Sequence, residues 1–188
     1  MKNKYTKGDY LYLQNKKKME IIKTIVFFAI SAALYLAGYI TTGSNKNYLT
    51  IVAVLGCLPA SKSAVSMIMN LKIKGCSKES YHAISRKLSN RDGAFNLYFT
   101  SYDKNYDMSH VYAKGMTVIG FTENSKIVES DFEEHIRMIL NKDAIKGVNV
   151  KLYKDLDKYL NRMEQMQNLE NEKSREKDIM KNLYAVSL

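Results

Sequence analysis

The chain has 188 residues, 46% of them hydrophobic, with nine glycines and one proline. This composition excludes a collagen-like or low-complexity chain, and the length fits one folded domain with accessory segments. The formal net charge is +10, but residues 1–92 hold 15 Lys/Arg against 4 Asp/Glu, whereas residues 93–188 hold 14 against 15. The positive excess surrounds two apolar runs, which favours membrane topology over a nucleic-acid interface. No nucleic-acid partner is therefore expected.

Residues 1–20 form a basic segment in which Tyr5, Tyr10 and Tyr12 are interleaved with lysines. Aromatic and basic residues beside a membrane helix typically face the lipid headgroups. We therefore expect a cytoplasmic N-terminal segment that contacts a lipid bilayer with anionic headgroups.

The first apolar run extends from Thr24 to Ile40, 17 residues without a charge. This is the short end of the roughly 17–25 residues that cross a bilayer, and the stem of Lys23 can lengthen the usable span. A cleaved signal peptide is the alternative, but no clear A-x-A site precedes the following loop. The sequence predicts a retained transmembrane helix over about residues 21–41.

The second apolar run predicts a helix over about residues 48–73 that contains Pro59 and Lys62. Proline removes a backbone hydrogen bond, so we expect a kink near Pro59. Lys62 lies 14 residues after Tyr48, about 21 Å along a helix, so its stem can reach the cytoplasmic side of a ~30 Å hydrocarbon core.

Two arrangements fit the residues beyond Pro59. The favoured one is a helix that bends there and leaves the bilayer along the cytoplasmic surface. In the other, the helix continues through the bilayer, and a polar stripe of Lys62, Ser66 and Asn70 contacts the first helix, a partner or water. Intramembrane ionisable residues are often functional, which makes this stripe the candidate site.

Lysine and arginine counts orient the hairpin. Seven lysines precede the first run, only Lys46 lies in the connecting loop, and six Lys/Arg follow the second run. The sequence therefore predicts a multi-pass protein of the cell membrane, with a transmembrane hairpin over residues 21–74 and both termini cytoplasmic. Cys57 and Cys76 have no CxxC or Cys/His spacing, so no metal site is expected.

Residues 77–166 have the pattern of a cytoplasmic α/β domain, with a charged C-terminal helix or tail over 167–188. The predicted order is helix, three strands, helix, strand, helix, which gives an α+β fold with a four-stranded mixed sheet and two to three helices. Three finer features are predicted: Phe95, Leu97 and Phe99 on one face of the first strand, a hairpin turn at Lys114–Gly115, and a capping box of Ser130 and Glu133.

The αβββαβ order over roughly residues 78–153 resembles the core of the PD-(D/E)xK nuclease-like superfamily. The resemblance implies a metal site with an acidic residue on the second strand and an acid-x-Lys triplet on the next. Here Tyr112 stands two residues before Lys114 where an acid would be needed, and Glu123 precedes Lys126 by three residues. The motif is absent, so we expect no catalytic, cofactor or metal residue. His82, His110 and His135 are scattered singly.

As a whole, through "GYITTGSNKNYLTIVAVLGCLPASKSAV" and "FTSYDKNYDMSH", the chain resembles an uncharacterised family of small bacterial two-pass membrane proteins. The expected function is a membrane-anchored cytoplasmic interaction or assembly module, without catalytic activity, that acts as a homo-oligomer or with a protein partner. Two alternatives stay open. One is an enzyme with an unrecognised site in a degenerate nuclease-like domain, and the other is a small oligomeric membrane protein working through the Lys62 helix.

Overall fold

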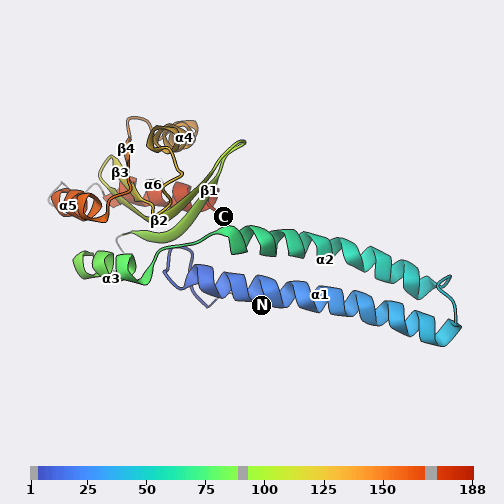
Figure 1. Cartoon of the computed structure of the whole chain (residues 1–188). Coiled ribbons are helices and arrows are strands. Elements are labelled where there is room, and N and C mark those ends of the chain that lie inside the picture. The colour runs from blue at the N-terminus through green and yellow to red at the C-terminus, as the bar shows by residue number, and fades with distance from the viewer. Residues whose placement is uncertain (1–3, 89–92, 168–172) are drawn as a thin grey trace. The chain divides into compact units, whose positions relative to one another are not determined.

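The computed structural model describes residues 4–88, 93–167 and 173–188. Six helices and a four-stranded mixed sheet are formed by these residues, which confirms the predicted α+β fold (Figure 1). The chain divides into two compact units. One contains the hairpin over residues 13–73, and the other combines residues 5–12 with residues 74–188.

The hairpin consists of α1 (Tyr12–Thr42) and α2 (Tyr48–Lys72), both long and apolar enough to cross a membrane. Helix α1 begins nine residues before the predicted start at residue 21, because the lysine-rich segment is composed of good helix formers and continues the helix. Helix α2 runs as one helix through Pro59. The Asn47 side chain caps its N-terminus by accepting a hydrogen bond from the backbone N–H of Thr50 (2.8 Å).

The sheet has the strand order β1-β2-β3-β4, in which β1, β2 and β3 are antiparallel neighbours and β4 runs parallel to β3. The predicted turn at Lys114–Gly115 is wrong by one residue. Lys114 pairs with Thr117, so Gly115 and Met116 form the turn, and Gly115 supplies the positive φ of 57°. The strand bounds are β1 Ala94–Thr100, β2 Asn105–Lys114, β3 Thr117–Phe121 and β4 Asn149–Tyr153.

Helices cover both faces of this sheet. Helices α4 and α6 pack on one face, and α3 and α5 pack on the other. Helix α6 lies within the predicted C-terminal segment and packs on the sheet, because its Ile179 and Leu183 are fully buried. The helix bounds are α3 Lys78–Lys87, α4 Glu129–Lys142, α5 Leu156–Gln167 and α6 Lys173–Val186.

The predicted capping box at the start of α4 is wrong. The helix begins at Glu129 after Val128, which provides no side-chain cap. The Glu133 carboxylate instead accepts a hydrogen bond from the backbone N–H of Leu152 (3.1 Å) and pairs with Lys151 (3.3 Å). Leu152 lies on β4 at the edge of the sheet, where a backbone N–H lacks a neighbouring strand, so the carboxylate satisfies it.

The predicted common face of Phe95, Leu97 and Phe99 is also wrong. Phe95 packs in the α3/α5 layer, whereas Leu97 and Phe99 pack in the α4/α6 layer. The cause is Asn96, which has a φ of 58° and interrupts the alternation of the strand. Asparagine is among the few non-glycine residues that adopt this left-handed conformation readily.

The Asn96 side chain fastens two distant segments to this strand. Its Nδ2 donates to the carbonyl oxygen of Tyr10 (2.8 Å), and its Oδ1 accepts from the backbone N–H of Cys76 (2.6 Å). Tyr10 lies just before α1 and Cys76 lies just after α2. The Tyr10 ring stacks on Tyr81 with centroids 4.0 Å apart, so it packs within this unit. One amide thus holds both connections to the hairpin.

Replacing Asn96 should separate the roles of its side chain and its backbone. Asn96→Ala loses both hydrogen bonds and must still adopt a positive φ, so we expect the free energy of unfolding to fall by about 3 kcal/mol. Asn96→Gly loses the same bonds without the backbone strain and should lose about 2 kcal/mol. Denaturant titration of the detergent-solubilised chain, followed by tyrosine near-ultraviolet circular dichroism, measures the difference. Equal losses would contradict the backbone role.

Candidate functional site

The inner side of the hairpin carries small and polar residues. On α1, Thr24, Ser31 and Gly38 are buried at intervals of seven residues. A seven-residue spacing keeps one stripe of each helix facing its neighbour along its length. The buried residues of α2 are Ala53, Ala60, Ser63 and Asn70. We call these buried residues of the two helices, together with Gly56, the seam.

Three contacts fix how the helices align along the seam. The Thr24 and Ser63 hydroxyl oxygens lie 3.0 Å apart. A Cβ atom placed on Gly56 would lie 2.8 Å from the Ser31 hydroxyl oxygen, and one on Gly38 would lie 2.9 Å from the Leu49 Cβ. Successive contacts are seven residues apart on both helices, so the register holds from one end to the other. A side chain at either glycine would meet side-chain atoms of the facing segment, so the small residues allow a close approach here.

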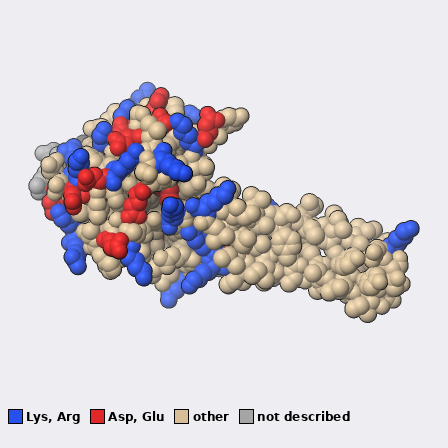
Figure 2. Space-filling model, viewed as in Figure 1, with Lys and Arg blue, Asp and Glu red and all other residues tan. Residues whose placement is uncertain are grey.

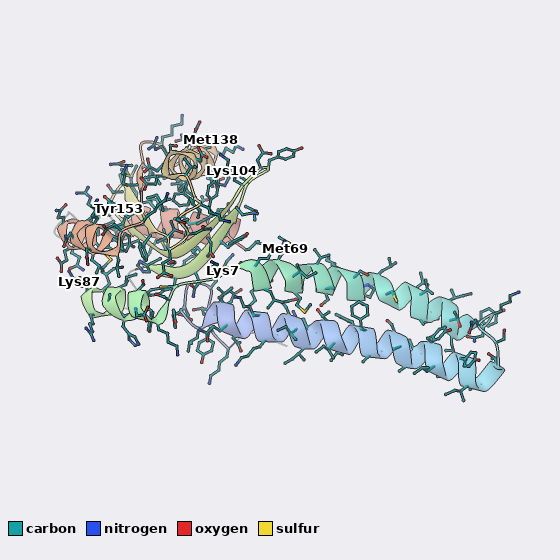
Figure 3. All side chains as sticks on the ribbon, in the orientation of Figure 1. Lys7, Met69, Lys87, Lys104, Met138 and Tyr153 are labelled. Carbon is teal, nitrogen blue, oxygen red and sulfur yellow. The ribbon has the colours of Figure 1, made fainter. Side chains whose placement is uncertain are left out.

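The outer side of the hairpin carries large apolar residues. Figure 2 shows a long stretch of this surface without acidic or basic side chains, and Figure 3 shows its side chains projecting outward. A soluble hairpin buries its large apolar residues, whereas this one buries its small and polar residues. Such an inverted arrangement is typical of helices surrounded by lipid. The exposed residues include Phe27, Phe28, Ile30, Leu36, Ile40, Ile51, Val54, Leu55 and Leu58.

The structure divides the predicted stripe of Lys62, Ser66 and Asn70. Asn70 is buried in the seam and donates from its Nδ2 to the carbonyl oxygen of Ser66 (2.8 Å), Ser66 is half-buried, and Lys62 is exposed. At about 100° per residue, Ser63 and Asn70 lie within roughly 20° of each other, while Lys62 lies about 80° from Asn70. Ser63, which widens the polar stripe next to Lys62, is buried in the seam and contacts Thr24.

The two ends of the hairpin differ in charge. The open end is the one at which the chain enters α1 and leaves α2. There, the Lys17 ammonium donates to the carbonyl oxygen of Ile73, the residue at which α2 ends. Lys23 forms an ion pair with Glu20, with a nitrogen–oxygen distance of 3.0 Å. At the closed end, the loop holds Lys46 and neutral polar groups, and the Tyr35 hydroxyl donates to the Asn45 amide oxygen (3.1 Å). A lysine at a helix C-terminus satisfies carbonyl groups that lack intrahelical partners.

The second unit contains a buried histidine–tyrosine pair. His110 Nδ1 lies 2.6 Å from the Tyr159 hydroxyl oxygen. Burial lowers the pKa of His110 to about 3 and raises the pKa of Tyr159 well above 10. The His110 ring also packs against Phe95, with centroids 4.4 Å apart. Enclosed between two layers and neutral at pH 7, this pair stabilises the core rather than transferring protons to a substrate.

Glu123, one of the positions considered for a nuclease-like motif, has a structural role. Its carboxylate accepts hydrogen bonds from the backbone N–H (3.0 Å) and hydroxyl (2.7 Å) of Ser77 and from the Ser80 hydroxyl (2.5 Å). These bonds hold the start of α3 against the end of β3. Tyr112, the other position considered, is buried in the α3/α5 layer.

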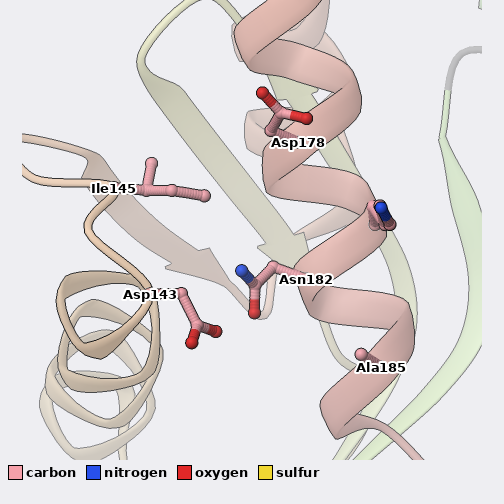
Figure 4. A pocket seen from close by; sticks show the side chains of 6 residues that line it. Asp143, Ile145, Asp178, Asn182 and Ala185 are labelled. Carbon is pink, nitrogen blue, oxygen red and sulfur yellow. The ribbon is translucent and has the colours of Figure 1, made fainter.

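Two surface depressions contain charged residues. One of about 480 Å³ lies between the end of α4 and α6 and is lined by Asp143, Asp178 and Lys181 (Figure 4). The other, of about 470 Å³, lies at the start of α4 beside Lys151 and Lys154. In the part of the chain that the structure describes, no group of three or more His, Cys, Asp or Glu residues is placed to hold a metal ion.

Comparison with known proteins leaves the geometry as the basis for function. No protein-family model, curated protein or solved structure matches the chain. The seam, the apolar outer surface and the basic end of the hairpin are the features that bear on its function.

Enlarging a seam residue should separate α1 from α2. Gly56→Leu places a side chain against Ser31, so we expect the detergent-solubilised chain to lose about 2 kcal/mol of stability. Cys57→Leu adds a similar side chain at the neighbouring, exposed position and should have little effect. Helix content measured by circular dichroism during thermal unfolding compares the two. A Cys57→Leu variant as unstable as Gly56→Leu would contradict the seam.

Proposed function

We propose that this chain is a two-pass membrane protein whose hairpin anchors a cytoplasmic interaction or assembly module. The observation that carries the proposal is the hairpin, which buries hydroxyl groups and glycines at its seam and exposes Phe28, Leu36 and other large apolar residues. In water this surface would be unfavourable over its whole length, whereas lipid tails solvate it without cost.

The length of the uncharged section supports insertion. From Thr24 to Ile40, α1 rises about 25 Å, and the stems of flanking lysines add several ångströms at the open end. Both segments are continuous helices, and a helix is one of the two forms in which a spanning segment can satisfy its backbone groups internally. The chain turns between them over residues 43–47 alone.

The charge difference between the two ends supports the orientation. Most of the basic residues of the hairpin lie at its open end, and Lys46 alone lies in the loop. Because basic flanks are retained on the cytoplasmic side, we propose that both termini and the α+β unit are cytoplasmic.

The surface of the α+β unit supports an interaction role. Groups outside the strands bond to both sheet edges. On β1, Phe95 donates to the carbonyl oxygen of Gly8 and Tyr98 accepts from the N–H of Leu188, and on β4 the N–H of Leu152 donates to Glu133. A partner would therefore be recognised by side chains rather than by strand addition. Tyr102 is fully exposed at the tip of the β1–β2 hairpin, and tyrosine is a frequent anchor of protein interfaces. An ion pair between Lys104 and Asp131 fastens this tip to α4.

Insertion and orientation can be tested together by cysteine labelling. In a Cys57→Ser background the remaining thiol is that of Cys76, and burial raises its pKa to about 12, so it should stay unreactive. Ser44→Cys in the loop should react with a membrane-impermeant maleimide on intact cells, whereas Lys158→Cys on α5 should react only after permeabilisation. The chain should also resist extraction by alkaline carbonate. Extraction, or labelling in the opposite order, would refute the proposal.

The interaction role can be tested at the exposed tip. A photo-crosslinking residue in place of Tyr102 should give discrete higher-mass adducts in native membranes, because the tip is proposed to contact a protein or a second copy. The same residue at the exposed Asn141 of α4 is the control and should give fewer. Mass spectrometry identifies the adduct. No adduct at either position would count against the interaction module.

A further inference from the structure

The lysines at the open end of the hairpin form a surface whose chemistry fits one class of partner. We propose that Lys18, Lys23, Lys62 and Lys72, here called the lysine belt, bind the phosphate groups of anionic phospholipids in the cytoplasmic leaflet. This inference rests on the proposed insertion of the hairpin. Beyond insertion, the four lysines are the residues that would recognise the lipid, and the exposed Lys62 acquires a role.

The register of the seam places two of these lysines at nearly the same level. Lys23 directly precedes Thr24 and Lys62 directly precedes Ser63, and those two hydroxyl groups are in contact. Because the helices are antiparallel, the two lysines lie on either side of this contact along the axis, about 3 Å apart in height. This level is where the uncharged section ends on both helices, so it corresponds to the boundary between hydrocarbon and phosphate groups.

The same register places Lys23 and Lys62 on one face of the hairpin. Each lies one residue before a seam residue, and equivalent positions of an antiparallel pair are related by a two-fold axis perpendicular to the plane of the helices. Their stems therefore flank the same side of the seam. Two ammonium groups converging on one phosphate can each donate a charge-assisted hydrogen bond to it.

The remaining belt lysines extend the basic surface outward. Lys18 lies five residues before Lys23, about 7.5 Å further along α1, and Lys72 lies ten residues after Lys62, about 15 Å further along α2. Both are exposed. Together the four lysines span the layer in which headgroups are found and continue just beyond it.

The hairpin does not neutralise this charge itself. Glu20 is the single acidic residue between residues 13 and 73, and it pairs with Lys23, which keeps further N–H donors for a second acceptor. An anionic headgroup is the counter-ion that the bilayer offers at this level. A lysine near the membrane surface enriches anionic lipid by roughly five-fold when it acts alone.

The opposite end of the hairpin provides an internal comparison. It holds one lysine, Lys46, in a loop with neutral polar residues. The surface therefore favours anionic lipid in one leaflet and not in the other. Of the N-terminal tyrosines, Tyr10 packs against Tyr81 in the second unit.

The test uses the full chain in vesicles of phosphatidylcholine with a minor fraction of phosphatidylglycerol. Spin-labelled versions of both lipids report their relative association with the protein. We expect phosphatidylglycerol to be favoured several-fold, with the preference falling towards equality in Lys23→Gln/Lys62→Gln and in concentrated salt. Lys62→Arg keeps the charge and should keep the preference, and Lys46→Gln is the matched control that should match the parent chain.

Three results would overturn the proposal. The first is an equal association of both lipids with the parent chain. The second is a loss in Lys46→Gln as large as that in the double variant. The third is displacement of phosphatidylglycerol by inorganic phosphate beyond the effect of chloride at equal ionic strength, which would show a site for the free anion. Carbonate extraction of the same vesicles separates the two claims. A retained chain without lipid preference refutes the lysine belt alone, and an extracted chain refutes the anchor as well.

Discussion

The close approach of α1 to α2 at Gly56 and Ser31 is the constraint on which the hairpin depends. A side chain at Gly56 would meet the Ser31 hydroxyl oxygen, so the two helices approach closely there and carry their large apolar residues on the outer side. The same contact sets the register that brings Thr24 to Ser63. The outer apolar surface, the level of Lys62 and the basic open end all follow from this alignment.

The second unit is organised around the chain segments that enter and leave the hairpin. Asn96 bonds to Tyr10 before α1 and to Cys76 after α2, and Glu123 holds the start of α3 immediately beyond. The Lys7 ammonium donates to the carbonyl oxygen of Tyr184 in α6 (2.7 Å), so the N-terminal segment also binds the last helix. The segments on either side of the hairpin are thus part of the packed core of this unit.

Alternation and helical periodicity were sufficient to predict the order in which the strands and helices of the second unit follow along the chain. They were not sufficient where a distant partner decides the local conformation. Phe95 lies on the opposite face from Leu97 because Asn96 has a left-handed backbone conformation. Glu133 does not cap α4, because it accepts a hydrogen bond from a backbone N–H of the edge strand β4. The seam residues recur every seven residues, whereas Lys62, Ser66 and Asn70 recur every four. The predicted polar stripe therefore includes Asn70 of the seam but also the exposed Lys62. The burial of Ile179 similarly depends on a sheet face that no local pattern reveals.

The central claim is that lipid surrounds the hairpin, and a nitroxide scan of α1 from Thr24 to Ile40 in vesicles tests it most directly. Labels at outward positions such as Phe28 and Leu36 should be accessible to oxygen and shielded from a water-soluble nickel chelate, with the oxygen effect largest near the middle of the scan. A label at Leu34, which is half-buried beside the seam, should be less accessible to oxygen than the outward labels, which gives a helical period. Access of the nickel chelate to outward positions along the whole scan would contradict the account.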